Sequence, residues 1–549
     1  MAAFAPSAST SSWTPSSWRT RPVAQDVAYP DAAALEAVTQ RLAVLPGLVT
    51  PNEVDRLRKQ LADVAQGKAF LLQSGDCAEL FSDCEPRKID AKLKLSLLMS
   101  LVLIWGARLP VVRVGRIAGQ YAKPRSKATE MVKTAEGEQE VLTFRGDNVN
   151  AFAADPAARQ PDPQRLLLAY FHSSTTLNHI RGALGSGIAD LHAPHSWSLA
   201  HVRSPALQRE FSSVVDSLGD ALHFMKVVGA DRADGVRGSL ESVDYFTSHE
   251  GLMLEYEEAL TRRAAGVPGA SYQTSESPSS SEGASSGAHY TLSAHTIWLG
   301  DRTRQLDGAH VEYFRGLANP IGIKVGPSMK PAELVELLAL LDPKAEVGRC
   351  TLICRFGAGK APSLLPPLIR AVRASAHADS VIWCCDPMHG NTRTSPLDAS
   401  IKTRAFGDIV TEVVESLAVH AQEGSRLGGV HLELTGEVDA RGESVTECVG
   451  GSMELSAEDL SRRYMTHCDP RLNYEQSLDI AFLLSHSLRA RRLGRAPSQS
   501  RLRPTALDRQ PSPVPPPQQH QTAANGAAEG QETEERILAE LVRGIANRP

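Results

Sequence analysis

Four side chains with metal-ligating atoms stand in four separate segments of the chain. They are the thiol of Cys77, the imidazole of His389, and the carboxylates of Glu433 and Asp469. Such a mixture of soft and hard donors is typical of sites for Mn²⁺, Co²⁺, Fe²⁺ or Zn²⁺, whereas Mg²⁺ prefers oxygen ligands. We expect these four residues to bind one divalent cation. The donor types do not choose among these metals, and Mn²⁺ is our first candidate.

Each of these residues, taken singly, has an ordinary structural alternative, as a packed cysteine, a hydrogen-bonded loop histidine or a turn aspartate. Glu433 also has two rivals as a ligand, His431 and Glu437. Residues 431 and 433 share one face of a strand, so His431 can instead support the ligands from behind. The four together, at matching ends of separate strands, favour a metal site.

A second set of residues is cationic or polar and stands close to glycines and strand ends. Its members are Arg116, Lys123, Arg125, Ser126, Arg302, Arg304, Lys324 and Arg355. Arginine offers a planar fork that matches phosphate or carboxylate oxygens, and lysine offers a point charge. A series of charged residues usually lies on the solvated surface. Because these residues stand beside strand ends and glycines, a phosphate-binding site is the favoured interpretation. The segment RFGAGK lacks the GxxxxGK[ST] spacing, which excludes a P-loop nucleotide site.

Eight short, mostly apolar runs must position these residues. They are Ala69–Gln73, Val111–Val114, Phe224–Val228, Leu292–Trp298, Ile321–Val325, Cys350–Cys354, Val381–Cys385 and Gly429–Leu434. Strands that are buried on both faces read as continuous apolar runs, and function at the carboxyl ends of all strands is the mark of a (β/α)₈ barrel. We therefore predict an α/β fold, a TIM barrel with an N-terminal helical extension, inserted segments and a disordered C-terminal tail.

The chain divides into three predicted parts. These are an extension over residues 1–66 (a disordered start, then two helices within 31–66), the catalytic barrel over 67–494 with a Ser/Gly-rich loop at 269–287, and a disordered tail over 495–549 with a possible short terminal helix. Thr50, Pro51 and Glu53 predict a capping box at the start of the second helix. The stretch from Arg125 to Ala221 is too long for one crossover helix and predicts inserted structure, with a helix at Leu166–Leu177.

Composition excludes several function classes. The net charge is −5 and no RNP, KH or zinc-finger pattern occurs, so we expect no nucleic-acid partner. The longest apolar stretch, Leu95–Trp105, is too short to span a bilayer, so we expect no membrane partner. No secretory signal is evident, which predicts reduced cysteines and a cytoplasmic location. A plastid stays possible because residues 1–12 are rich in Ser and Ala and lack acids.

Nine segments together resemble class II (plant-type) 3-deoxy-D-arabino-heptulosonate 7-phosphate (DAHP) synthases. They are FLLQSGDCAELF, RVGRIAGQYAKPRS, FTSHEGLMLEYEEALTR, TRQLDGAHVEYFRG, NPIGIKVGP, WCCDPMHGNT, GGVHLELTGE, VTECVGG and CDPRLNYEQSLDIAFLL. The resemblance implies a TIM barrel, a divalent metal, and condensation of phosphoenolpyruvate with D-erythrose 4-phosphate and water to give DAHP plus phosphate. This reaction is the first step of the shikimate pathway to aromatic amino acids. Homo-oligomers are also implied.

The same resemblance assigns roles residue by residue. It implies metal ligands at Cys77, His389, Glu433 and Asp469, phosphoenolpyruvate contacts at Arg116, Arg302, Lys324 and Arg355, and erythrose 4-phosphate contacts at Lys123, Arg125 and Ser126. We add Asp301 to the expected phosphoenolpyruvate contacts and expect catalytic roles for Lys324, Arg355 and His389. One departure stands at Asp301, because the family's GERTRQ reads GDRTRQ here and the carboxylate is one methylene shorter.

Some roles stay open at this point. Lys324 is our candidate acid/base, because neighbouring arginines should lower its pKa, but a plain phosphate anchor is an equal alternative. Two other functions remain in competition. One is another metal-dependent phosphosugar aldolase, which has no reason to keep the Arg116–Ser126 block together with Arg355. The other is a non-catalytic regulatory homologue, which should have lost metal ligands.

Overall fold

The structure is a computed structural model that describes residues 13–134, 137–188, 204–227, 243–264, 287–439 and 441–494. The predicted disordered start, most of the Ser/Gly-rich loop and the predicted tail with its terminal helix lie outside these residues. Within them, no helix combines the length and apolar character that a membrane crossing needs.

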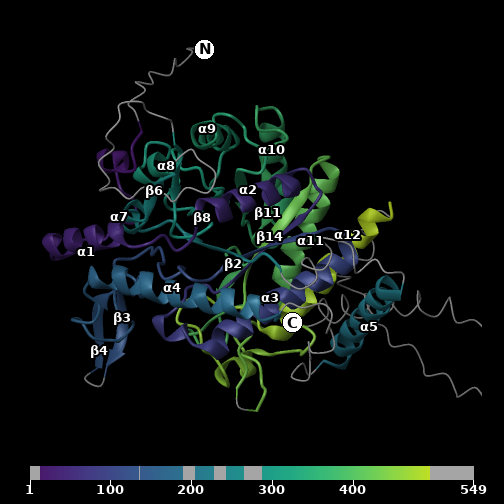
Figure 1. Ribbon diagram of the computed structural model, residues 1–549. Coiled ribbons are helices and arrows are strands. Elements are labelled where there is room, and N and C mark those ends of the chain that lie inside the picture. Colours follow the sequence, from purple (N-terminus) through teal and green to yellow (C-terminus); the bar gives the residue numbers. More distant parts are fainter. Residues whose placement is uncertain are drawn as a thin grey trace, which may run out of the picture.

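Eight parallel strands close into a barrel at the centre of the molecule (Figure 1). In order around the barrel they are β1 (Phe70–Gly75), β14 (Leu427–Glu433), β11 (Ile382–Cys385), β10 (Cys350–Cys354), β9 (Ile321–Val325), β8 (Thr296–Leu299), β5 (Phe246–Glu250) and β2 (Val111–Arg116). Because β1 pairs with both β14 and β2, no edge is left open. All carboxyl ends therefore meet at one mouth, and the predicted TIM barrel is confirmed.

One of the eight predicted strands is wrong. Residues 224–227 of the run Phe224–Val228 belong to helix α5 (Pro205–Val227), and the third barrel strand is β5 instead. The sequence FTSHE of β5 does not read as apolar, because it places buried polar side chains inside the barrel. Ser248, for example, donates a hydrogen bond to the carbonyl of Gly115 on β2 at 3.0 Å.

Helices surround the barrel, most of them as crossovers between strands, while the last one follows the last strand. They are α3 (Pro86–Ala107), α7 (Leu254–Ala259), α8 (Ala309–Phe314), α9 (Pro331–Leu341), α10 (Ala361–Arg373), α11 (Phe406–Gln422) and α12 (Tyr474–Arg492). Helix α9 begins at Pro331 and buries one apolar face, with Leu334, Leu337, Leu338 and Leu341. The long helices α3 and α12 lie side by side against one flank of the barrel (Figure 1).

The N-terminal extension forms the two predicted helices, α1 (Ala32–Val44) and α2 (Pro51–Ala65). The capping box is present, since Thr50 Oγ1 accepts from the Glu53 amide at 3.3 Å and Glu53 Oε2 accepts from the Thr50 amide at 2.8 Å. The apolar stripe of α2, including Leu61, packs on residues near the amino ends of the strands. Helix α2 thus covers the bottom of the barrel, opposite the mouth.

Inserted structure occupies the long segment after β2, as predicted. It contains a hairpin, β3 (Thr129–Thr134) with β4 (Gly137–Leu142), then helix α4 (Gln164–Gly185) and helix α5. A second small hairpin, β12 (Thr392–Thr394) with β13 (Lys402–Arg404), lies between β11 and α11 and matters for the site below.

Candidate metal and anion site

His389 and Glu433 meet at the mouth of the barrel. The Nε2 of His389, which follows β11, lies 3.0 Å from Oε1 of Glu433, the last residue of β14. Two donor atoms that each stand about 2.1 Å from one ion, at right angles, are about 3.0 Å apart. This separation is that of a hydrogen bond between the two side chains, and it also matches two donors that share a small divalent cation.

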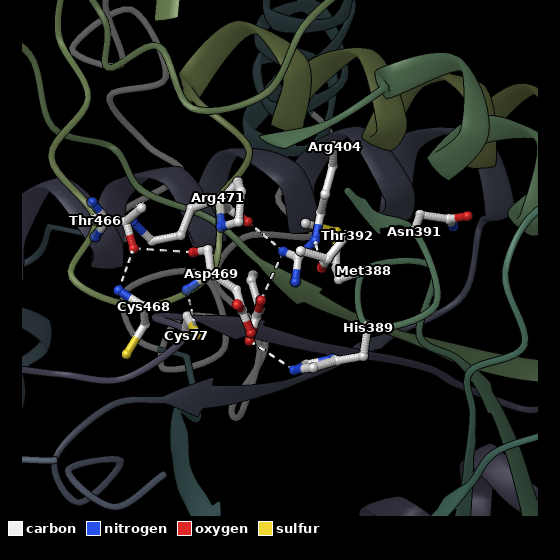
Figure 2. Close-up of polar contacts among 12 residues, drawn as sticks. Cys77, Met388, His389, Asn391, Thr392, Arg404, Thr466, Cys468, Asp469 and Arg471 are labelled. Atoms are coloured by element: carbon white, nitrogen blue, oxygen red, sulfur yellow. Dashed lines mark hydrogen bonds and ion pairs between the residues drawn. The ribbon is translucent and has the colours of Figure 1, made fainter. Parts of the chain in front are cut away.

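Cys77 and Asp469 form a second pair beside the first. The backbone amide of Asp469 lies 3.4 Å from the sulfur of Cys77, and Lys123 Nζ reaches both, at 3.3 Å from Sγ and 3.0 Å from Asp469 Oδ2. Figure 2 shows that Cys77, Asp469 and His389 turn toward one region, although they come from distant parts of the chain. The structure thus places the four predicted ligands as two neighbouring pairs at the mouth, but no three of their donor atoms lie within 4.8 Å of one another.

Cys468 stands next to these two pairs as well. A hydrogen bond to Cys77, with the nearby charge of Lys123, lowers the pKa of Cys468 to about 6 although burial opposes the shift. The same hydrogen bond and burial raise the pKa of Cys77. A coordinated divalent cation would reverse that order, because it favours the thiolate of its ligand.

Asp386 orients His389 and contacts Lys324 at the same time. Its Oδ2 accepts a hydrogen bond from His389 Nδ1 at 2.7 Å and is ion-paired with the ammonium of Lys324, while Oδ1 accepts from the His389 amide at 3.2 Å. A carboxylate on one ring nitrogen fixes the tautomer and leaves the other nitrogen free to ligate. Asp386 was missed by sequence reasoning, although it stands in the segment WCCDPMHGNT.

Among the described residues, the trio of ligand atoms that does come close together is a different one. One atom each from Asp386, His389 and His431 lies within 4.8 Å of the other two. His431, however, is already engaged by Gln73 Oε1 at Nδ1, at 2.8 Å, and by Arg116 at Nε2. Asp386 is engaged in the same way, and so are Glu433, by Arg116 and Arg404, and Asp469, by Lys123. These engagements do not distinguish the trio from the predicted ligand set, which stays a proposal.

Two arginines bracket the carboxylate of Glu433. Arg116 Nη2 lies 2.9 Å from Oε1, and Arg404 Nη1 lies 2.7 Å from Oε2. Burial by itself raises the pKa of Glu433, but His389, Arg404 and Arg116 hold it well below the usual range. Arg404, from strand β13, is a second residue that sequence reasoning missed, because its segment KTR carries no recognisable signal.

A buried ion network joins the loops that carry Cys77 and Asp469. Arg471 donates to Asp76 Oδ1 at 2.7 Å and to Glu447 at 2.8 and 3.1 Å, and Lys92 is ion-paired with the other oxygen of Asp76. Asp76 precedes Cys77, and Arg471 follows Asp469 by two residues. The network therefore ties two of the ligand-bearing loops together beneath the cluster.

The predicted phosphoenolpyruvate residues line the neighbouring side of the mouth. Arg355 Nη1 lies 3.4 Å from Asp301 Oδ2, and Asp301 Oδ1 lies 3.0 Å from Arg304 Nε. The shorter Asp301 therefore still contacts both arginines. Burial, with the charge of Arg116, lowers the pKa of Lys324, although Asp386 opposes the shift. The direction agrees with the sequence expectation, but burial is the larger cause.

The three predicted erythrose 4-phosphate residues contact different parts of the mouth. Lys123 lies among the metal-ligand candidates, and the neighbouring Cys468, Cys77 and Asp469 raise its pKa although burial lowers it. Arg125 donates from Nε to the Phe144 carbonyl at 2.5 Å, whereas Ser126 Oγ accepts from Arg302 at 2.8 Å. Ser126 thus touches a residue of the phosphoenolpyruvate set.

Four cysteines are packed in the wall of the barrel. Each of them is a free, buried thiol on or beside β10 or β11: Cys350, Cys354, Cys384 and Cys385. Burial raises the pKa of each thiol, which keeps it protonated and inert.

Comparison with known proteins agrees with this geometry. The model of the class-II DAHP synthetase family matches residues 13–485. A phospho-2-dehydro-3-deoxyheptonate aldolase of Neurospora crassa is 53% identical over 481 residues, which are 87% of this chain and 95% of that protein. Proteins of the same name from Streptomyces coelicolor (86% of this chain, 96% of that protein) and Mycolicibacterium smegmatis (85% and 93%) are each 44% identical. The chain therefore belongs to the class-II DAHP synthetase family, and the expectation of a DAHP synthase at the first step of the shikimate pathway is confirmed.

Proposed function

We propose that Cys77, His389, Glu433 and Asp469 hold the divalent cation on which condensation of phosphoenolpyruvate with erythrose 4-phosphate depends in this chain, with Mn²⁺ the first candidate. The observation that carries this proposal is the 3.0 Å contact between His389 Nε2 and Glu433 Oε1, with the Cys77–Asp469 pair beside it. The donor set of one sulfur, one nitrogen and two carboxylates suits Mn²⁺, Co²⁺, Fe²⁺ or Zn²⁺. Bound there, the cation supplies Lewis-acid polarisation of the aldehyde oxygen.

The cations of the mouth hold phosphoenolpyruvate in this proposal. Arg116, Arg302, Lys324 and Arg355 offset the charge of its phosphate and carboxylate, which would otherwise repel the second anionic substrate. Asp301 fixes the direction of the Arg355 guanidinium through their 3.4 Å contact. Held in this way, the C3 carbon of phosphoenolpyruvate can face the aldehyde carbon.

The bonds and charges of the reaction balance without a redox partner. C3 of phosphoenolpyruvate forms a bond to the aldehyde carbon, water adds at C2, and the C2–O bond to phosphate breaks. The products are DAHP and inorganic phosphate. Of the described residues, Lys324 is our candidate for the proton donor to the departing phosphate oxygen, because burial lowers its pKa. Its runner-up role is a fixed phosphate anchor.

Erythrose 4-phosphate is assigned to Lys123, Arg125 and Ser126. The 2.8 Å contact from Arg302 Nη2 to Ser126 Oγ supports this assignment, because it joins this set to the phosphoenolpyruvate set across the mouth. Lys123, which contacts Cys77 and Asp469, would then have to turn from the ligand cluster toward the substrate when both sites fill.

The test of the metal assignment uses chelated protein to which Mn²⁺, Co²⁺, Fe²⁺ or Zn²⁺ is returned one at a time. Phosphate release from phosphoenolpyruvate and erythrose 4-phosphate should vanish on chelation and return with the ion. Cys77→Ala should lower Mn²⁺ affinity, measured calorimetrically, and abolish metal-dependent turnover. Full turnover in that variant would refute the ligand set, and phosphate release with other aldoses at the same rate would favour a broader phosphosugar aldolase.

Assembly and location belong to the proposal as well. We infer a cytoplasmic homo-oligomer, and the free thiols of all eight cysteines are compatible with a reducing compartment. Light scattering on the purified chain gives the oligomeric state, and a monomer at working concentration would contradict this inference. Fluorescence microscopy of a C-terminal fusion distinguishes cytoplasm from plastid.

A further inference from the structure

Two loops of the mouth meet backbone to backbone. The loop after β10 carries Arg355 and Gly357, and the loop after β11 carries His389 and Gly390. A Cβ on Gly390 would lie 2.3 Å from the Gly357 amide nitrogen, so neither loop leaves room for a side chain between them. Arg355 also donates to the His389 carbonyl. The position of the Arg355 guanidinium is therefore linked to the position of the His389 imidazole.

A buried carboxylate stands behind this junction and bonds to both loops. Glu412 projects from helix α11 and is fully buried. Its Oε1 accepts from the Phe356 amide at 2.7 Å, and its Oε2 accepts from Asn391 Nδ2 at 2.8 Å. One residue of each loop, next to Arg355 in the first and two beyond His389 in the second, is thus held by the same side chain.

Asn391 completes the connection. Its Oδ1 accepts from the Ala358 amide at 2.9 Å, and its Nδ2 also donates to the Pro387 carbonyl at 2.8 Å. Both ends of this amide are therefore engaged, and its orientation is set. In Figure 2 the side chain of Asn391 points away from the cluster around Cys77 and Asp469, which agrees with a supporting role and not with ligation.

The network requires a pure acceptor at position 412. Each described partner of the Glu412 carboxylate is an uncharged N–H donor, and burial raises its pKa to about 7 although these hydrogen bonds oppose the shift. A glutamine there would set its own NH₂ against the NH₂ of Asn391, which cannot turn without losing Ala358 and Pro387. Burial of a carboxylate costs free energy. A buried acid at this position therefore indicates that the network uses both of its oxygens as hydrogen-bond acceptors.

We propose that Glu412 is a positioning residue that, through Phe356 and Asn391, fixes the Arg355 guanidinium relative to the His389 imidazole and so couples substrate-anion binding to metal binding. The inference rests on the proposed roles of Arg355 and His389. Neither Glu412 nor Asn391 touches substrate. Their effect reaches the reaction only through the geometry of the two loops.

The test compares Glu412→Gln with the double variant Glu412→Gln/Asn391→Asp. The single variant should bind Mn²⁺ about tenfold more weakly in the absence of substrates, as loss of an outer support does at metal sites. Its KM for phosphoenolpyruvate should rise about tenfold with a smaller change in kcat, because an unpaired buried donor costs roughly one power of ten. In the double variant, the carboxylate introduced at position 391 can accept from the amide introduced at position 412 and from the Ala358 N–H. It loses the donor to the Pro387 carbonyl, so both quantities should return only part of the way toward wild type.

A matched control is Glu423→Gln, which removes an acid at the exposed end of the same helix and should leave both quantities unchanged. If Glu412→Gln does not fold, Asn391→Ala leaves the Glu412–Phe356 bond in place and should show the same two losses. Unchanged Mn²⁺ affinity and KM in a folded Glu412→Gln variant would overturn the positioning role. Failure of the wild-type chain to bind Mn²⁺ would instead overturn the proposed metal site, so the two failures are distinguishable.

Discussion

The two ends of the barrel differ in their side chains, which are apolar at the bottom and charged at the mouth. At the bottom, Leu57, Leu61 and Val64 of α2 pack against apolar strand residues. At the mouth, the same strands end in buried charges, among them Arg116 and Glu433. Burial of apolar surface stabilises a fold without regard to direction, whereas buried charges cost free energy unless each is paired. Packing at the bottom therefore raises the free energy of unfolding, whereas the buried charges at the mouth lower it wherever they are unpaired. Four variants test this difference between the two ends.

The largest effect is expected from Arg471→Met, at the mouth. The substitution leaves Asp76 and Glu447 buried without their arginine and should lower the free energy of unfolding by about 3–5 kcal/mol. Urea denaturation measures it. A loss below about 1 kcal/mol would mean that water or Lys92 replaces the arginine and that the mouth tolerates loose charges.

Leu61→Ala tests the other end of the barrel. Leu61 is 2% exposed in the apolar cluster beneath the strands, so the cavity should lower the free energy of unfolding by about 3 kcal/mol. Because the substitution lies far from the mouth, kcat and KM measured well below the unfolding temperature should stay at wild-type values. A fall in kcat without a change in Mn²⁺ affinity would show that the two ends are not independent.

A third variant, Asp479→Asn, probes the loops that extend the mouth. Asp479, on α12, accepts from the Ser452 amide at 2.9 Å, and burial raises its pKa to about 7. The folded protein therefore keeps a proton that the unfolded chain releases between about pH 4 and 7, so this group's stabilising contribution falls as pH rises through that window. Asparagine removes the dependence and should stabilise the protein at pH 8 by on the order of 2 kcal/mol. Thermal unfolding at pH 5 and pH 8 measures it, and an equal effect at both pH values would contradict the raised pKa.

The smallest effect belongs to Thr50→Ala, at the start of α2. Loss of the N-cap should cost about 1 kcal/mol. The matched variant Thr50→Ser keeps the cap oxygen and should stay close to wild type. If both variants are neutral, packing of α2 on the barrel and not its cap determines the stability of the bottom.

The sequence predicted those parts of the molecule that have a local pattern, such as an apolar run or a capping box. Continuous apolar runs predicted seven of the barrel strands, and the capping box placed α2 to the residue. Strand β5 was missed because it is polar inside the barrel, where Ser248 and its neighbours bond to adjacent strands. A hydrophobic pattern reveals a strand that is buried among apolar side chains, but not one whose inward-facing side chains are polar and hydrogen-bonded.

The supporting residues of the site could not be read from the chain. Asp386, Arg404, Glu412 and Arg471 have ordinary types in ordinary positions, and what distinguishes them is their partners. Arg471 and Asp76, for example, are 395 positions apart. Without a pattern at fixed spacing, only the closed barrel shows that they meet.

The separation of Cys77 and Asp469 by 392 positions has a consequence for how the molecule is made. Strand β1 emerges early from the ribosome, but its partner β14 and the Asp469 loop follow only after most of the chain. At about 5–20 residues per second, the wait is roughly 20 to 80 s. During it the nascent chain carries an unpaired strand edge, which is open to pairing with other chains, and the proposed metal site stays incomplete until residue 469 has been made.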